Sequence, residues 1–135
     1  MRLSKKLSQI IERERVCRVA TVNPEGVPHL VPVCSVLADG KIYFGSGNDA
    51  RKIKNLEANP SCAVTVDLYA EDWTYLKGVM VQGRATIIAK GPRFRKARAL
   101  LYRKFPSYET DAALDEKDSV IVEVTPTSAF SWGLD

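Results

Sequence analysis

Short segments rich in strand-forming residues, separated by tight turns, constrain the fold of this chain more than any other feature. Residues 15–22, 28–37 and 41–45 are rich in Val, Leu, Ile and aromatic residues, and most of these types favour strands. The sequences NPEG and ADG lie between them and carry the residues that tight turns require. Parallel strands need a crossover of a dozen residues or more, so connections this short indicate antiparallel pairing. The first third of the chain is therefore predicted to be an antiparallel meander.

The rest of the chain continues this alternation of short elements. Further strands are predicted over residues 61–68, 75–89 and 119–125, and helices over residues 3–13, 50–58 and 93–104. About six strands in a chain of 135 residues lose their exposed edges when they close into a barrel. The predicted fold class is mainly β: a barrel of about six antiparallel strands with Greek-key-like connections, flanked by short helices. At this length we expect a single domain, residues 1–135.

Proline and glycine residues mark places where the predicted strands depart from regular pairing. Pro32 lies within the second strand, and because it has no backbone N–H it requires a strand edge, a bulge or a gap in the ladder. Gly78 and Gly83 lie within the longest predicted strand and indicate a bend or a bulge there.

The composition argues against several classes of protein. The lone histidine, His29, and the absence of a CxxC pair among the three cysteines indicate neither a metal site nor a thioredoxin-like motif. No stretch approaches the ~20 apolar residues of a membrane helix, and no secretory signal is recognisable, so we expect no membrane partner and a cytoplasmic location. The net charge of +4 is mildly basic. Tyr43 and Phe44 are adjacent and point to opposite faces of a strand, so no nucleic-acid partner is expected.

The segment between the third and fourth strands contains a possible anion site. Gly45-Ser46-Gly47 is predicted to be a turn that leads into a helix beginning near Arg51 and Lys52. A helix N-terminus offers unpaired N–H groups, Ser46 adds a hydroxyl, and the two basic side chains add charge-assisted donors. Together these groups would bind a phosphate. An ordinary helix start with exposed basic residues fits the same pattern, so both interpretations remain open.

Taken in order, these segments resemble one known family. The sequence ATVNPEGVPHLVPV is followed by the strand KIYFGSG, the helix ARKIKNLEANP, another strand and then VQGRA. This order is similar to that of the FMN-binding split barrels of the pyridoxamine 5′-phosphate oxidase-like family. The resemblance covers residues 15–90, and the last strand extends it to about residue 132. It implies a split β-barrel and a homodimer that binds FMN at two sites on the subunit interface.

The resemblance also implies which residues hold the cofactor. Along the flavin ring would lie the backbone of His29, Leu30, Val31, Pro32 and Val33. Gly45 and Ser46 would lie beside the ribityl phosphate, and Arg51 and Lys52 would bind that phosphate. Gln82 would reach the flavin from the other subunit, and Trp132 would cover part of the ring. The residues alone also allow Gln82 to be a solvent-facing strand residue and Trp132 to pack in a dimer seam. Asn55, in the same helix as Arg51, is expected to have a structural role.

The activity implied by the resemblance is that of an FMN-dependent oxidoreductase acting on a small molecule. Oxidases of pyridoxamine phosphate carry a further basic C-terminal segment, whereas this chain ends with the tail SWGLD, so oxidation of vitamin B6 is not expected. The sequence VDLYAEDW resembles a shorter subfamily that includes users of the deazaflavin coenzyme F420. A reductase dependent on coenzyme F420 and a non-enzymatic module that binds flavin or haem therefore remain alternatives. No catalytic side chain is assigned, because the cofactor itself carries the redox step.

Overall fold

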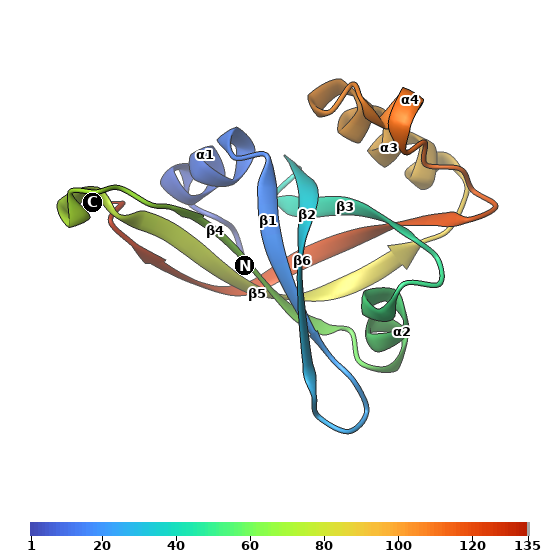
Figure 1. The fold of residues 1–135 in the computed structure, drawn as a ribbon, viewed down its shortest axis with the longest axis horizontal. Helices are drawn as coiled ribbons and strands as arrows, with labels where there is room; N and C mark the ends of the chain where they lie inside the picture. Colours follow the sequence, from blue (N-terminus) through green and yellow to red (C-terminus); the bar gives the residue numbers. More distant parts are fainter. Residues whose placement is uncertain (135) are drawn as a thin grey trace.

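The computed structural model describes residues 1–134 as a closed antiparallel barrel with the strand order β1-β2-β3-β6-β5-β4 (Figure 1). Its elements are α1 (Lys5–Arg13), β1 (Val16–Val22), β2 (Pro28–Ala38), β3 (Lys41–Gly47), α2 (Arg51–Ala58), β4 (Ser61–Leu68), the 3₁₀ helix η1 (Trp73–Tyr75), β5 (Lys77–Ile88), α3 (Pro92–Lys104), α4 (Tyr108–Asp111) and β6 (Ser119–Trp132). The predicted fold class, a mainly β barrel of six antiparallel strands with short helices, is confirmed. Within residues 1–134, no helix combines the length and the apolar character that crossing a membrane requires.

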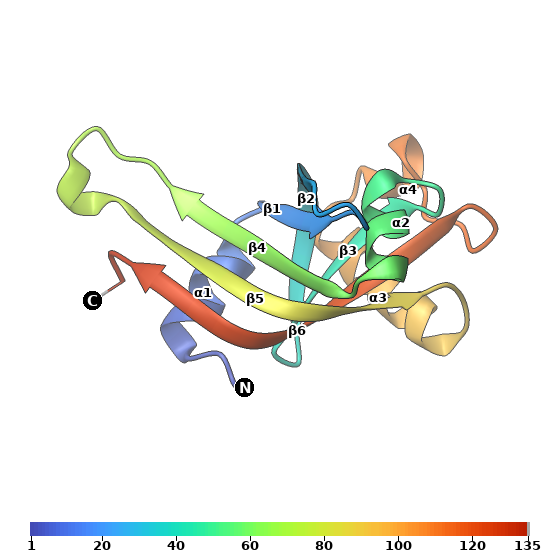
Figure 2. The ribbon, with the colours of Figure 1, turned by 90° about the horizontal axis from the view of Figure 1, so that it is seen from below.

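Two strands run further than the sequence predicts. β3 continues through Ser46 to Gly47, because its pairing with β6 extends to the pair Gly47↔Ser119. The predicted turn at Gly45-Ser46-Gly47 is therefore wrong. β6 does not stop near residue 125 but follows β5 to the pair Gly78↔Trp132, with a register shift between Gln82 and Gly83. This shift confirms the irregularity predicted at Gly83. Figure 2 shows β4, β5 and β6 running side by side toward η1.

Over residues 28–34, β2 has a partner strand on one edge only. β1 pairs with this whole stretch, whereas β3 pairs with β2 only from Ser35 onward. Among the described residues, the second edge of this stretch is therefore open. Because Pro32 lies within it, the prediction that this proline needs a strand edge is confirmed.

The backbone groups of Pro28, Leu30 and Pro32 point toward this open edge. Hydrogen-bonded pairs alternate along an antiparallel ladder, and the bond from the Ser35 N–H to the Arg15 carbonyl (3.4 Å) identifies the odd-numbered residues as those bonded to β1. Cys34 is the fourth even-numbered residue of the stretch, and of the four only Leu30 and Cys34 have an N–H, because proline has none. The open edge thus presents four carbonyl groups and two N–H groups, beside the Leu30 side chain, which is 64% exposed.

Two apolar clusters hold the helices and strands together. The larger one fills the barrel with fully buried side chains such as Val19, Phe44 and Val122. The smaller one lies between α3 and the outer face of the barrel and includes Leu101 and Leu114. Burying each such side chain contributes roughly 1.5–3 kcal/mol. The smaller cluster fixes the position of α3 and of the chain that follows it against β2 and β3.

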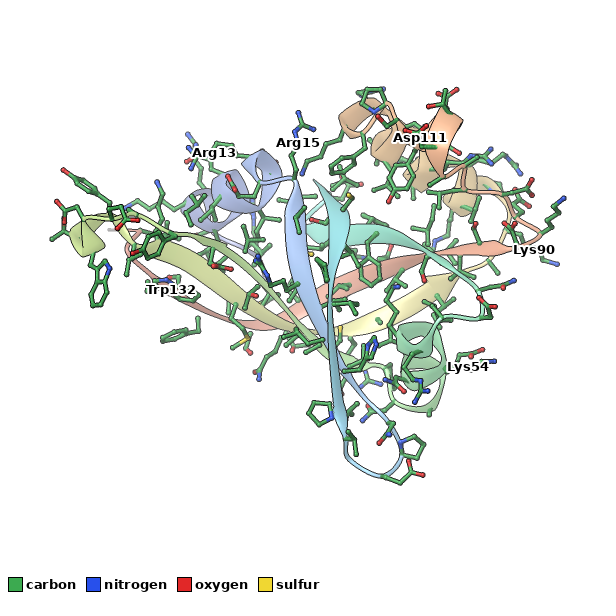
Figure 3. The ribbon with its side chains drawn as sticks, in the orientation of Figure 1. Arg13, Arg15, Lys54, Lys90, Asp111 and Trp132 are labelled. Carbon is green, nitrogen blue, oxygen red and sulfur yellow. The ribbon has the colours of Figure 1, made fainter. Side chains whose placement is uncertain are left out.

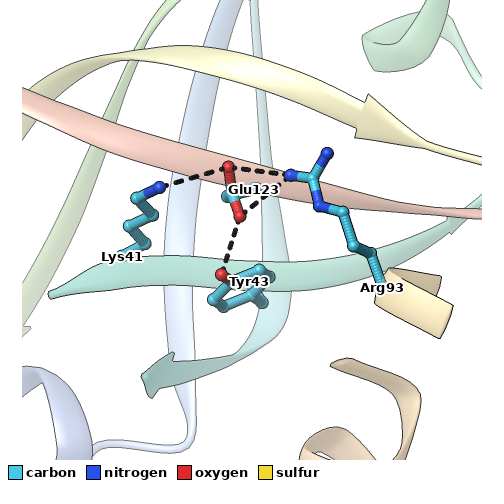
Figure 4. Close-up of polar contacts among 4 residues, drawn as sticks. All are labelled: Lys41, Tyr43, Arg93 and Glu123. Carbon is cyan, nitrogen blue, oxygen red and sulfur yellow. Dashed lines mark hydrogen bonds and ion pairs between the residues drawn. The ribbon is translucent and has the colours of Figure 1, made fainter. Parts of the chain in front are cut away.

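A buried carboxylate joins α3 to β3 and β6 (Figure 4). Glu123 accepts a hydrogen bond from the Tyr43 hydroxyl at 2.7 Å, and its oxygens lie 3.3 Å from the Arg93 guanidinium and 3.7 Å from the Lys41 amine. Burial alone would raise the pKa of Glu123, but the Tyr43 hydrogen bond and the two positive charges outweigh it and lower the pKa below its ordinary value. The same contact, together with burial, raises the pKa of Tyr43 to about 12.

Glu123→Gln is expected to lower the free energy of unfolding at neutral pH by about 1–2 kcal/mol, because it removes the charge that two cations face. A carboxyl group whose pKa is lowered by folding stabilises the protein above its ordinary pKa, 4.5, and this contribution is lost as the pH falls through the lowered value. Urea unfolding at pH 7 and at pH 3 should therefore show a smaller difference between variant and wild type at pH 3 than at pH 7. Glu116→Gln, in the exposed pair with Arg95, is the control and should change stability by less than ~0.5 kcal/mol. An equal deficit at both pH values would refute the role given to the Glu123 charge.

Candidate functional site

The N-terminus of α2 lacks a side-chain cap. The residue before the helix is Ala50, whose side chain cannot accept a hydrogen bond, and the first turn contains no acidic residue. The N–H groups of Ile53 and Lys54 both donate to the Ala50 carbonyl, at 3.0 and 3.1 Å. Within residues 1–134, the N–H groups of Arg51 and Lys52 make no hydrogen bond to the protein. This end of the helix therefore carries unpaired donors and a partial positive charge.

Two basic side chains at this helix end have no acidic partner. No ion pair within residues 1–134 involves Arg51 or Lys52. Lys52 is half-buried, and desolvation lowers the pKa of its amine. A partly desolvated cation is stabilised by an opposite charge. The helix end, Arg51 and Lys52 thus form a site whose unpaired donors fit a dianion such as a phosphate group.

A buried hydrogen bond fixes α2 to the barrel. The Asn55 side-chain amide donates to the Thr21 hydroxyl at 3.0 Å, and both residues are 3% exposed. Thr21 lies on β1 and pairs with His29 of β2. The structural role expected for Asn55 is confirmed, and its partner is a side chain of strand β1. One contact therefore connects the helix that carries the basic pair to β1, the strand that pairs with the open stretch of β2.

The predicted residues of β2 divide between two faces of that strand. His29, Val31 and Val33 are partly buried, and Val31 and Val33 pack against the barrel core, whereas Leu30 and Pro32 are exposed. The His29 Nδ1 atom is buried and has no hydrogen-bond partner in the described chain. The open edge and its exposed side chains can accept a flat ligand whose polar rim needs acceptors and one donor.

Gly45 and Ser46 lie within β3, and contacts inside the protein account for both. A side chain at Gly45 would place its Cβ 2.7 Å from the Leu114 Cδ2 atom, so glycine leaves room for Leu114 where the smaller apolar cluster meets β3. Ser46 is buried on the same face of β3 as Phe44, and its hydroxyl donates to the Gly47 carbonyl at 2.9 Å. Neither residue adds a free donor to the α2 end in this structure.

Gln82 and Trp132 lie on the long β5–β6 ladder. The Ser128 hydroxyl donates to the Gln82 side-chain oxygen at 2.8 Å, and Gln82 helps to line an open depression of about 550 Å³ that also includes Thr21 and Pro28. Trp132 packs against Gly78, where any side chain would collide with its indole ring. Trp132 and Lys54 of α2 lie at opposite ends of the molecule (Figure 3). One chain therefore brings Gln82 near the Thr21 side of the site but does not bring Trp132 near the basic pair.

The structure also contains a cavity that sequence reasoning missed. It measures about 430 Å³ and lies between β2 and the α3–α4 turn, lined by Cys34, Lys104, Phe105 and Tyr108 among others. The sequence signals for it are weak, because residues 107–117 are mostly polar and are predicted only as irregular chain or a short helix. Across residues 1–134, no cluster of three or more His, Cys, Asp or Glu side chains is arranged to hold a metal ion.

Comparison with known proteins gives a family model and a set of solved structures. The family model described as pyridoxamine 5′-phosphate oxidase matches residues 3–133. No curated protein sequence matches the chain. A conserved hypothetical protein from Mycobacterium tuberculosis has a similar structure, with a TM-score of 0.83 and 20% identity over 96% of this chain and 84% of that one.

Two further structures have descriptions that name a ligand. HutZ, a haem storage protein from Vibrio cholerae, has a TM-score of 0.80 and 18% identity, covering 96% of this chain and 94% of that one. A protein described as an F420 reductase has a TM-score of 0.74 and 23% identity, covering 95% and 98%. At these identities, the likeness to the solved structures shows the fold that they share with this chain.

Proposed function

The chain belongs to the pyridoxamine 5′-phosphate oxidase family, and from this premise we propose that it binds FMN and acts as an FMN-dependent oxidoreductase on a small molecule. The observation that carries the proposal is the uncapped N-terminus of α2, where Arg51 and Lys52 have no acidic partner. This helix end lies beside the β1–β2 pair, because the side chain of Asn55 on α2 donates a hydrogen bond to Thr21 on β1. Bound FMN would supply the redox chemistry.

In this proposal each part of the site has a separate task. Arg51, Lys52 and the first N–H groups of α2 bind the phosphate. One carbonyl group of the open edge would accept from the single ring N–H of the flavin, and the Leu30 N–H would donate to an acceptor on the rim. The exposed apolar side chains of this stretch would exclude water from one side of the ring. His29 contributes the ring nitrogen Nδ1, which has no hydrogen-bond partner among residues 1–134. No side chain is assigned a proton-transfer step.

We also propose that the cofactor site is completed by a second copy of the chain. The support is the distance between the basic pair and the aromatic end of the β5–β6 ladder (Figure 3), and the exposure of large apolar side chains at both places. Leu30 is 64% exposed on β2, and Phe130 is 62% exposed beside Trp132, with the two ring centres 5.9 Å apart. Exposed apolar side chains that adjoin one another are unusual on an isolated domain. In a homodimer, Gln82 and Trp132 of one copy would meet the flavin bound along β2 of the other.

Light scattering coupled to size exclusion is expected to give the mass of a dimer at micromolar concentration. Leu30→Glu should shift the mass toward the monomer and weaken FMN binding, because it places a charge on an apolar surface that dimerisation buries. Lys90→Glu also changes one exposed residue, but on the loop before α3, and should leave both properties unchanged. A monomeric wild-type protein that still binds FMN tightly would refute the shared site.

A specific observation supports a second cofactor, the deazaflavin coenzyme F420. The exposed Lys54 follows Arg51 and Lys52 on α2 and has no ion-pair partner among the described residues. Three cations on one short helix suit a polyanionic cofactor, and one of the similar structures is described as an F420 reductase. The same groups would bind the single phosphate of FMN, so binding experiments have to decide between the two.

The deciding experiment is an absorbance spectrum of the purified protein, followed by separate titrations with FMN, coenzyme F420 and haemin. Saturable binding of FMN at micromolar concentration or below would support the proposed function, and reduction of the bound flavin by a nicotinamide donor would support redox activity. Binding of the deazaflavin alone would replace FMN with coenzyme F420. Binding of haemin alone would favour a non-enzymatic haem-binding role. Failure of all three would refute the proposal.

A further inference from the structure

The cavity between β2 and the α3–α4 turn has aromatic walls and a charged border. It is lined by Arg15, Cys34, Lys104, Phe105, Tyr108 and Ala112, among others, is open to solvent on one side and measures about 430 Å³. The rings of Phe105 and Tyr108 meet edge to face with their centres 6.1 Å apart, and Tyr102 stacks on Tyr108 from the other side at 6.0 Å. Paired rings of this kind hold one another in place. The cavity is therefore formed before any ligand arrives and can receive a flat, apolar molecule.

Hydrogen bonds across the cavity fix the segments that surround it. The Lys104 amine donates to the carbonyl groups of Glu14 and Ser35, each at 2.7 Å. The Arg15 guanidinium donates to the Lys104 carbonyl at 2.6 Å. These bonds connect the end of α3 to the start of β1 and to β2. The walls consequently belong to three separate parts of the chain and keep their spacing without a bound ligand.

Two cations border the cavity, and neither has an acidic partner. The Arg15 guanidinium lies 5.8 Å and the Lys104 amine 5.4 Å from the centre of the Phe105 ring. Neither forms an ion pair within the described chain, although Asp111 also lines the cavity. Burial and the neighbouring Arg15 charge lower the pKa of Lys104. An anion placed between the two cations would offset their repulsion and the cost of desolvating the lysine.

We propose that this cavity binds a planar aromatic anion, with its ring against Phe105 and Tyr108 and its negative group toward Arg15 and Lys104. The lining residue Cys34 is also the last residue of the open stretch of β2. A ligand in the cavity therefore reaches the edge along which the flavin ring is proposed to lie. The role of the cavity as the substrate site rests on that proposed function, whereas its capacity to bind an aromatic anion does not.

The test uses the full chain and 8-anilinonaphthalene-1-sulfonate, an aromatic anion with a flat naphthalene ring whose fluorescence rises in apolar surroundings. Wild type is expected to bind it saturably at one site. Ala112→Trp fills the cavity and should weaken binding by ~tenfold or more, whereas Ala113→Trp, at the next exposed position outside the lining, should not change the affinity. Trp73→Ala removes an exposed aromatic side chain elsewhere (72% exposed) and should also leave the affinity unchanged. Equal binding by wild type and Ala112→Trp would overturn the proposal.

The charge preference is tested separately with N-phenyl-1-naphthylamine, which has the same rings without the sulfonate. The affinity of wild type for the anion should exceed its affinity for this neutral compound by ~tenfold or more. Arg15→Gln should remove most of that difference and leave the affinity for the neutral compound unchanged. A wild-type protein without any preference would overturn the assignment of an anion. FMN titrations of wild type and of Ala112→Trp separate the two proposals. If neither protein binds FMN while wild type still binds the aromatic anion, the proposed cofactor is refuted and the assignment of the cavity stands.

Discussion

Replacing Arg51 and Lys52 together with alanine is expected to weaken FMN binding by ~100-fold or more and to leave riboflavin binding within about twofold of wild type. Each charge-assisted hydrogen bond to a phosphate contributes roughly 1.5–3 kcal/mol, and riboflavin has no phosphate to lose. Neither side chain has an ion-pair partner among the described residues, so their removal should change the free energy of unfolding little. The selective loss would then report on the phosphate contact and not on the fold.

The measurement is a pair of fluorescence titrations, one with each flavin, together with urea unfolding of each variant. Lys54→Ala is the matched control, because Lys54 lies on the same helix, is exposed and comes after the first turn. It should weaken FMN binding by less than ~fivefold, the size expected of an exposed charge. If the double variant binds FMN as tightly as wild type, or loses riboflavin to the same extent, then the phosphate does not bind at the end of α2.

Asn55→Leu is expected to lower the free energy of unfolding by about 1–3 kcal/mol, because it leaves the buried Thr21 hydroxyl without a partner. The same variant should weaken FMN binding more than riboflavin binding, since it releases the helix that carries the phosphate donors from the strands that carry the ring edge. The 3.0 Å bond between the two side chains is the direct cause in both cases. Urea unfolding and the two flavin titrations measure the two effects independently.

The double variant Asn55→Leu/Thr21→Val provides the decisive comparison. Replacing both partners of a buried hydrogen bond with apolar groups is often nearly neutral, so the double variant should be more stable than Asn55→Leu alone. Its preference for FMN over riboflavin should recover in parallel. If the losses of stability from the two substitutions instead add, and the preference for FMN does not recover, the bond contributes to neither stability nor the alignment of the site.

The architecture of the barrel could be predicted because its signals are local. Turn sequences such as NPEG and ADG define where one strand ends and the next begins within a few residues. The extensions of β3 and β6 could not be predicted from the residues alone, because Ser46, Gly47 and Pro126 are poor strand formers. Their conformation is set by pairing with strands far away in the sequence.

The same distinction explains what could be predicted of the site. Arg51 and Lys52 are adjacent in the sequence at a helix start, so their role as unpaired cations could be recognised from the residues. Gly45 was predicted to flank a phosphate, but the structure accounts for it by its contact with Leu114, which lies far along the chain. The cavity bordered by Cys34 and Phe105 depends on three separate segments, and no single stretch of sequence contains its signal.

The two prolines of the open edge also affect how this protein behaves at high concentration. An exposed strand edge normally recruits strands from other molecules, which begins fibre formation. Here Pro28 and Pro32 remove two of the four outward N–H groups, so an incoming strand finds acceptors but only two donors, at Leu30 and Cys34. A small ligand that forms only one or two hydrogen bonds with the edge does not need the missing donors. The edge can therefore remain open to a small molecule without serving as a template for aggregation.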